Sequence, residues 1–139
     1  MAGQPNFPGW LIFDVSSMTA SEINDPHTVA TIIDQDVSSF QVHSHFNGSG
    51  IIWGWLKALG AAWEIEYSAE RLGPGPDQVL GIKPGNLTAA DSYGASVTNL
   101  VVPANTVPVG LYKLSCIVRF PLLHGLIGYV ADGPVIELF

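Results

Sequence analysis

Residues 110–120, GLYKLSCIVRF, carry the pattern that decides the predicted fold. Apolar side chains recur at every second position from Tyr112 to Phe120, whereas Lys113 and Arg119 fall on the opposite face. A period of two residues is typical of a strand with one face in the core and one face toward solvent. The stretch therefore predicts a long, half-buried antiparallel strand.

The same alternation occurs in residues 62–68, AWEIEYS, and in residues 39–47, SFQVHSHFN. Weaker strands are predicted at Leu11–Val15, Val79–Ile82, Ser96–Val102, Ile127–Ala131 and Pro134–Phe139. Segments rich in Gly, Pro, Asn and Asp separate them, as expected of tight connections. We therefore expect an all-β fold, a sandwich of two antiparallel sheets with seven or eight strands. Short helical turns are expected within residues 19–25, TASEIND, and residues 51–60, IIWGWLKALG.

The C-terminal third has a second feature. In residues 107–120, VPVGLYKLSCIVRF, a turn leads through Gly110 to Tyr112 at the start of the long strand, and residues 133–139, GPVIELF, supply a final strand. This Gly-x-Tyr entry resembles the tyrosine corner of immunoglobulin-like and fibronectin-like sandwiches. The resemblance covers residues 61–139 and implies an architecture but no activity. Cys116 is the only cysteine, so the Cys–Trp–Cys signature of true immunoglobulin domains is absent.

Composition limits the function classes. The chain has 139 residues and is expected to form one domain, residues 1–139. Charged residues make up 12%, about half the usual share. A net charge of -7 repels phosphate, which argues against nucleic-acid binding. Low charge density also favours association with other proteins, because charge repulsion keeps proteins apart in solution.

The first residues, MAGQPNFPGWLIFDVSS, lack the charged start and the long apolar run of a signal peptide. No segment has the roughly 18 uninterrupted apolar residues that would span a bilayer. The expected compartment is therefore the cytoplasm by default, with export by a dedicated apparatus as the alternative.

Residues 51–63, IIWGWLKALGAAW, contain Lys57 as their only charge. They are too short for a membrane span and too apolar for an exposed connection. Trp63 belongs to the core face of the following strand. We expect part of the remaining apolar set to lie on the surface of an isolated subunit and to be covered by a partner, most simply another copy. That predicted partner interface consists of Ile51, Ile52, Trp53, Trp55, Leu56 and Leu59.

The leading functional hypothesis is therefore a non-catalytic interaction or structural module that self-associates or docks into a larger protein assembly, with no cofactor. The alternative is a carbohydrate- or small-ligand-binding module in which Trp53 and Trp55, two residues apart, form a stacking platform. The third is a metal-dependent enzyme, because His43 and His45 share one face of a strand and could chelate a metal with a further ligand. His43 and His45 are weak candidates, since polar residues are ordinary on the outer face of a strand.

Overall fold

The computed structural model describes residues 2–3, 6–7, 10–22, 32–33, 39–122, 127–130 and 133–139. Its strands are β1 (Ala2–Gly3), β2 (Asn6–Phe7), β3 (Leu11–Glu22), β4 (Ile32–Ile33), β5 (Phe40–Ser49), β6 (Ala62–Arg71), β7 (Gln78–Asn86), β8 (Ser92–Tyr93), β9 (Leu100–Val102), β10 (Gly110–Arg119), β11 (Ile127–Val130) and β12 (Val135–Leu138). Its helices are α1 (Ile51–Ala58) and α2 (Ala95–Thr98). Of the 12 strands in these ranges, 8 have three or more residues, in agreement with the expected seven or eight.

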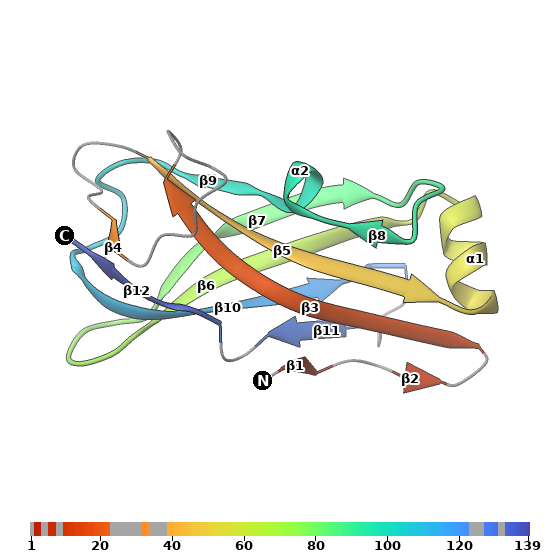
Figure 1. The fold of residues 1–139 in the computed structure, drawn as a ribbon, viewed down its shortest axis with the longest axis horizontal. Helices are drawn as coiled ribbons and strands as arrows, with labels where there is room; N and C mark the ends of the chain where they lie inside the picture. The colour runs from red at the N-terminus through yellow and green to blue at the C-terminus, as the bar shows by residue number, and fades with distance from the viewer. Residues whose placement is uncertain are drawn as a thin grey trace.

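The strands form two sheets that lie face to face (Figure 1). In the first sheet, β11 and β12 pair with different halves of one edge of β10, residues 116–119 and 110–113. Strand β1 pairs with β11, and β4 pairs with β12. The opposite edge of β10 pairs with β6, and β7 lies beyond β6. In the second sheet the order is β2-β3-β5-β8, and β9 also pairs with β5. All of these pairs are antiparallel except β12 with β4. The predicted all-β, immunoglobulin-like sandwich is thus confirmed as an architecture.

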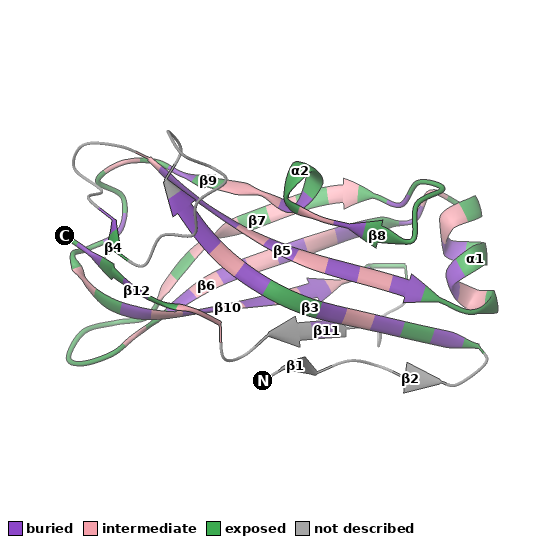
Figure 2. Cartoon of the chain, in the orientation of Figure 1, coloured by how far each residue is buried: buried purple, intermediate pink, exposed green. Residues whose placement is uncertain are grey.

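Alternation along the strands places the core between the two sheets (Figure 2). Every second residue of β10 from Tyr112 to Val118 is buried, as are Trp63, Ile65 and Tyr67 of β6. On β5 the predicted inner face is likewise buried, including the polar Ser44. The two-residue period therefore identified the inner faces of the three strongest strands correctly.

Strand β3 differs from the prediction, which ended a strand at Val15 and placed a helical turn within residues 19–25. The strand instead continues to Glu22, because it pairs with β5 from Ile12 opposite Ser49 to Glu22 opposite Phe40. The rest of the predicted helical turn, residues 23–25, lies outside the described residues. Pairing along this whole length satisfies the backbone groups that a helical turn would otherwise have to satisfy. A register shift between Val15 and Ser17 marks a bulge.

Helix α1 confirms the helical turns expected in residues 51–60. It ends in a Schellman motif: Gly60, at φ 60°, donates its N–H to the carbonyl of Lys57, and Ala61 donates to the carbonyl of Leu56 (3.0 Å each). Glycine at this position avoids the strain that a side chain would meet at positive φ. In the described part of the chain, neither helix has the length and apolar character required to cross a bilayer.

Residues 95–98 form the single helical turn α2, although the sequence predicted a strand over Ser96–Val102. Thr98 explains the difference. Its hydroxyl donates to the carbonyl of Ser44 (2.6 Å), and its backbone N–H donates to the carbonyl of Gly94 (3.0 Å), which closes the turn. The backbone N–H of Ser44 donates to the same hydroxyl oxygen (3.3 Å). One side chain thus takes the place of a strand partner for β5 between β8 and β9.

The corner predicted at Tyr112 is present. The ring is 0% exposed, and the hydroxyl donates a hydrogen bond to the carbonyl of Pro108 (2.8 Å). Arg71 donates from Nη1 to the Tyr112 hydroxyl (3.0 Å) and from Nη2 to the carbonyl of Val109 (3.0 Å). These bonds fasten the turn before β10 to the end of β6.

Candidate functional site

Helix α1 divides the predicted partner interface into two faces. Trp53 is 1% exposed and Leu56 is 3% exposed, so both belong to the core of the subunit. Their inclusion in a partner surface was wrong, because positions three apart on a helix share a face and this face packs against the ends of the sheets. Ile52 is partly buried against the same core. Ile51, Trp55 and Leu59 are 53%, 60% and 72% exposed.

The proposed stacking platform of Trp53 and Trp55 was also wrong. Two residues apart on a helix correspond to a rotation of about 200°, so the two rings point in nearly opposite directions. The Trp53 ring lies over Gly48, and its Nε1 donates to Asp91 Oδ1 (3.0 Å). Lys57 pairs with the same carboxylate, and this hydrogen bond, followed by that of Trp53, lowers the pKa of Asp91 below its usual value.

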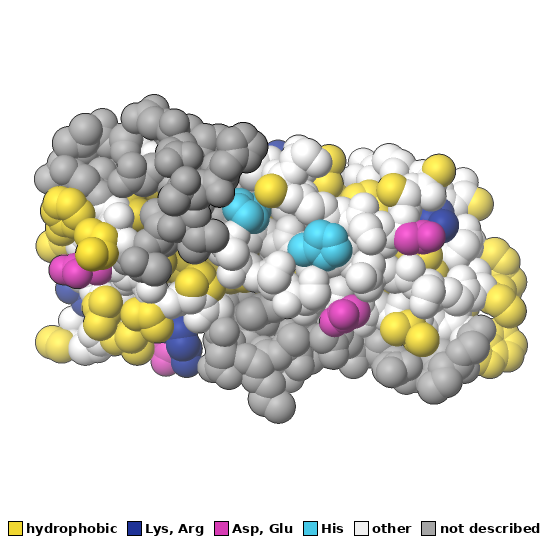
Figure 3. All heavy atoms as spheres, viewed as in Figure 1, with side chains coloured by type: hydrophobic (Ala, Val, Ile, Leu, Met, Phe, Trp, Pro, Cys, Tyr) yellow, Lys and Arg dark blue, Asp and Glu magenta, His cyan; other side chains and the backbone are white. Residues whose placement is uncertain are grey.

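The exposed face of α1 forms part of an apolar surface at one end of the sandwich, which we call the end surface: Trp10, Ile51, Trp55 and Leu59. Trp10, 59% exposed, lies at this end because its carbonyl accepts a hydrogen bond from the N–H of Ile52 (2.9 Å). Hydrophobic side chains gather at the α1 end in the space-filling view (Figure 3). The prediction that part of residues 51–63 is exposed on the isolated subunit agrees with this arrangement, and its burial by a partner stays a prediction.

The two candidate metal ligands lie half-buried on the outer face of β5. Thr19 Oγ1 lies 2.9 Å from Nε2 of His43, and Ser16 Oγ lies 3.0 Å from Nδ1 of His45. Burial lowers the pKa of His43. Within the described ranges, no group of three or more His, Cys, Asp or Glu side chains is placed to hold a metal ion. The described contacts of both histidines are therefore hydrogen bonds to hydroxyl groups on β3.

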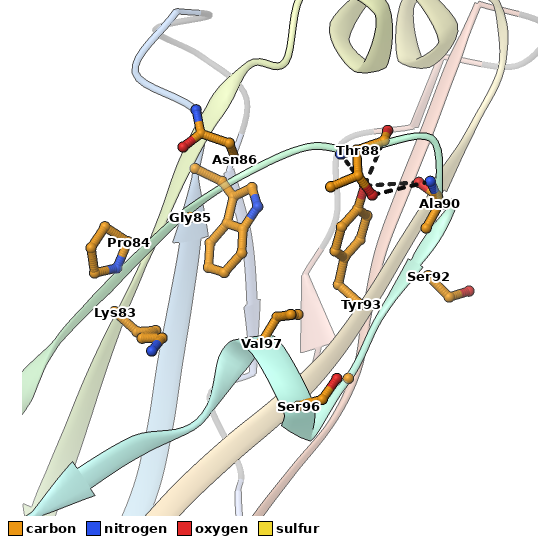
Figure 4. A pocket seen from close by; sticks show the side chains of 12 residues that line it. Lys83, Pro84, Gly85, Asn86, Thr88, Ala90, Ser92, Tyr93, Ser96 and Val97 are labelled. Atoms are coloured by element: carbon orange, nitrogen blue, oxygen red, sulfur yellow. Dashed lines mark hydrogen bonds between the residues drawn. The ribbon is translucent and has the colours of Figure 1, made fainter.

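A hollow lined by described residues lies between the edge of the first sheet and the short strands of the second. We call it the edge cleft; its volume is about 530 Å³. One wall consists of Trp63 and residues 83–86 of β7. The other consists of Thr88, Ala90, Ser92, Tyr93, Gly94, Ser96 and Val97. Figure 4 shows Lys83 and Gly85 on one side and Tyr93, Ser96 and Val97 across from them.

The inner wall is aromatic and closely packed. Trp63, 2% exposed, faces Gly85 across the β6–β7 pair, and a Cβ added to Gly85 would lie 2.2 Å from Cζ2 of the indole. Glycine is therefore required there for the ring to lie against β7. Nε1 of Trp63 is buried and has no hydrogen-bond partner among the described residues. Buried donors are almost always paired, so this N–H lacks the acceptor that a buried donor normally has.

Tyr93 fixes the opposite wall. Its hydroxyl accepts a hydrogen bond from the N–H of Thr88 (2.8 Å) and donates to the carbonyl of Ala90 (2.8 Å) (Figure 4). Its ring stacks on Phe46, with centroids 5.0 Å apart. The residue therefore holds the loop before β8 and contributes an aromatic surface to the core at the same time.

Helix α2 is held over the cleft by a buried polar network between the two sheets. The hydroxyl of Tyr67 on β6 donates to the carbonyl of Thr98 (2.7 Å) and lies 3.1 Å from Ser44 Oγ on β5. Burial raises the pKa of Tyr67, so its hydroxyl stays protonated and acts as a donor. Both walls of the cleft are therefore set by the folded chain itself, as in ligand sites that are formed before binding.

Sequence analysis missed the edge cleft. The predicted strand ended at Ile82, so Lys83 and Gly85 were not assigned to a sheet face. The sequence signal that could have indicated the cleft is Pro84. Proline lacks an N–H and is tolerated in a sheet mainly on an edge strand. A cleft between two sheets opens at such an edge.

No family model matches the sequence, and comparison with curated proteins found no match. Among solved structures, the chain is similar to a Niemann-Pick type C2 protein from the Japanese carpenter ant, at 9% sequence identity and a TM-score of 0.43, over 91% of this chain and 92% of that one.

Proposed function

We propose that this protein is a non-catalytic binding module and that it takes a small, largely apolar molecule into the edge cleft. The observation that carries the proposal is a cleft of about 530 Å³ that leads to the buried indole of Trp63 between the two sheets. Small-molecule sites typically have volumes of about 300–1,000 Å³ and combine apolar walls with a few polar groups. Here the ring of Tyr93 and the side chain of Val97 supply apolar surface, and hydroxyl groups lie at the rim.

The test uses N-phenyl-1-naphthylamine, a neutral probe whose fluorescence rises in apolar surroundings. Val97→Trp places a bulky ring in the cleft, whereas Val101→Trp is a matched control, because both valines are similarly exposed (42% and 46%) and only Val97 lines the cleft. We expect Val97→Trp to weaken probe binding about tenfold or more, and Val101→Trp to change it less than about twofold. Equal binding by the two variants would assign the probe to another surface.

Self-association is a second candidate function, supported by the end surface. Trp55 and Leu59 are 60% and 72% exposed on one face of α1, and large exposed aromatic side chains are frequent at the centres of protein interfaces. A second copy of the chain is the proposed occupant, because the end surface (Trp10, Ile51, Trp55 and Leu59) is apolar and contains no charged side chain that would oppose the same surface of another subunit.

Light scattering at several protein concentrations tests this candidate. We expect the double variant Trp55→Ser with Leu59→Ser to give a smaller, folded species than the unmodified chain. Val79→Ser is the control, because Val79 is 68% exposed on β7, away from α1. A monomeric mass for the unmodified chain at all concentrations would remove the self-association hypothesis and leave the cleft proposal unaffected.

A further inference from the structure

We propose that the edge cleft selects molecules in which a carboxylate is attached to an apolar group, with Lys83 as the counter-charge and the indole N–H of Trp63 as a second donor. This inference rests on the proposed function and adds the chemical class of the ligand. Three independent features of the cleft support it: the direction of Lys83, the distribution of charge, and the N–H of Trp63, which has no partner among the described residues.

Lys83 faces the interior of the sandwich. In the β6–β7 pair it lies opposite Ile65, and Gly85 lies opposite Trp63. Directly opposed residues of an antiparallel pair have their side chains on the same face, and Ile65 and Trp63 are both buried on the inner face. The lysine side chain therefore leaves the inner face of β7, at the edge where the second sheet does not cover it, and it lines the cleft.

The charge of Lys83 is uncompensated within the described part of the chain, where this lysine has no ion pair. The other described cations have partners. Lys57 pairs with Asp91, Lys113 with Glu70, and Arg119 with Glu64 and Glu66. Arg71 is occupied by hydrogen bonds to the Tyr112 hydroxyl and the Val109 carbonyl.

The described residues that line the cleft include no acid. The nearest acid along the chain, Asp91, directs its carboxylate to Trp53 and Lys57 of α1. In a chain of net charge -7, a cation in a hollow with such walls gives a local positive potential. An organic anion is therefore the charge type that this hollow favours.

The indole of Trp63 supplies the second donor. Cε2, the ring atom that carries Nε1, would lie 2.6 Å from a Cβ on Gly85, so this edge of the ring lies against the β7 side of the cleft. Trp63 and Lys83 are diagonal neighbours in the antiparallel pair, about 7 Å apart in a typical sheet. A carboxylate has two acceptor oxygens and can accept from an ammonium and an N–H at the same time.

An inward-facing lysine on an edge strand also discourages pairing with another sheet. That role predicts aggregation when Lys83 is replaced and no preference among ligands. Binding measurements therefore separate the two roles.

The experiment compares 1-naphthylacetate with 1-naphthylacetamide, which have the same ring and nearly the same size and differ in charge. Each displaces N-phenyl-1-naphthylamine from the full chain at pH 7. We expect the acetate to bind about five- to tenfold more tightly than the amide, because charge-assisted hydrogen bonds are the stronger ones. Added salt is expected to reduce this preference by screening.

Lys83→Met is expected to abolish the preference, because the acetate loses more affinity than the amide, and far-UV circular dichroism shows that the variant is folded. Lys113→Met is the matched control: it removes the same charge from the outer face of β10 and is expected to preserve the preference. Equal binding of the two compounds, insensitivity of the preference to salt, or equal losses in both variants would overturn the anion proposal. Failure of the neutral probe to bind, or its indifference to Val97→Trp, would instead overturn the proposed function on which this inference depends.

Discussion

The two ends of the sandwich are closed in different ways. At one end of the sandwich lies α1 (Figure 1). It inserts the Trp53 ring between the sheets, and the ring centroid lies 6.0 Å from those of both Phe13 and Phe120. At the other end, Tyr112 is held by hydrogen bonds to Pro108 and Arg71. The first closure depends mainly on volume and the second mainly on polar geometry. Variants at the two ends should therefore differ in how much stability they remove.

The largest effect is expected at the α1 end. Trp53→Ala leaves a cavity where a 1% exposed ring had packed, and should lower the free energy of unfolding by about 3–5 kcal/mol. Trp55→Ala, two residues away on the exposed face, should change it by less than about 0.5 kcal/mol. Urea denaturation of both variants measures the difference. Similar losses would show that the two faces of α1 are not distinct.

Glycine variants sharpen the same comparison. A Cβ at Gly48 would lie 2.3 Å from the Trp53 ring, so Gly48→Ala must displace the ring and should destabilise the protein by about 2 kcal/mol. Gly54 lies in α1 with no described atom within 4 Å of an added Cβ. Gly54→Ala should therefore stabilise the protein by about 0.5–1 kcal/mol, because alanine is the better helix former. Thermal denaturation of both variants would reveal opposite signs.

The two ends also differ in how well the sequence predicts them. The Tyr112 corner is local: the turn, Gly110 and the alternating strand follow one another, so a short motif identifies it. The faces of α1 are not visible in this way, because residues 51–60 are apolar on nearly all sides and periodicity cannot separate inner from outer positions. Only the position of the helix against Gly48 and Asp91 decides that Trp53 is inside.

The edge cleft depends on information still further from the local sequence. The inward direction of Lys83 follows from the register of β7 against β6, which includes a shift between Tyr67 and Ser68. A shift of one residue reverses the face of every later side chain. The turn at α2 likewise depends on Thr98 meeting Ser44, 54 positions earlier in the chain. Such pairings arise from the whole fold and are not encoded in any single segment.

A smaller loss is expected at the Tyr112 end. Tyr112→Phe keeps the buried ring but removes the hydroxyl that donates to Pro108 and accepts from Arg71, so it should lower the free energy of unfolding by about 1 kcal/mol. Combining it with Arg71→Met in a double-mutant cycle isolates the contact between the two side chains. Unchanged stability in Tyr112→Phe would show that packing, not polar geometry, closes this end as well.

The smallest effect is expected from the exposed Asp91 carboxylate, which joins α1 to the loop before β8. Lys57, followed by Trp53, lowers its pKa in the folded state below the ordinary value of 3.8. A depressed carboxyl pKa stabilises the folded protein above the unfolded-state pKa, and this contribution is lost as the pH falls through the lower, folded-state value. The stability difference between the unmodified chain and Asp91→Asn should therefore be constant above about pH 5 and shrink below pH 3.8.

The Asp91→Asn substitution keeps a side-chain oxygen that can accept from the Trp53 indole, so it removes the charge and spares the neutral contact. Lys57→Met removes the largest cause of the shift, and the carboxyl of Asp91, followed by NMR, should then titrate closer to 3.8. If the titration midpoint does not move in Lys57→Met, the ion pair contributes nothing at this end. The α1 closure would then depend on the Trp53 ring alone, and the contrast with the hydrogen-bonded Tyr112 end would be sharper still.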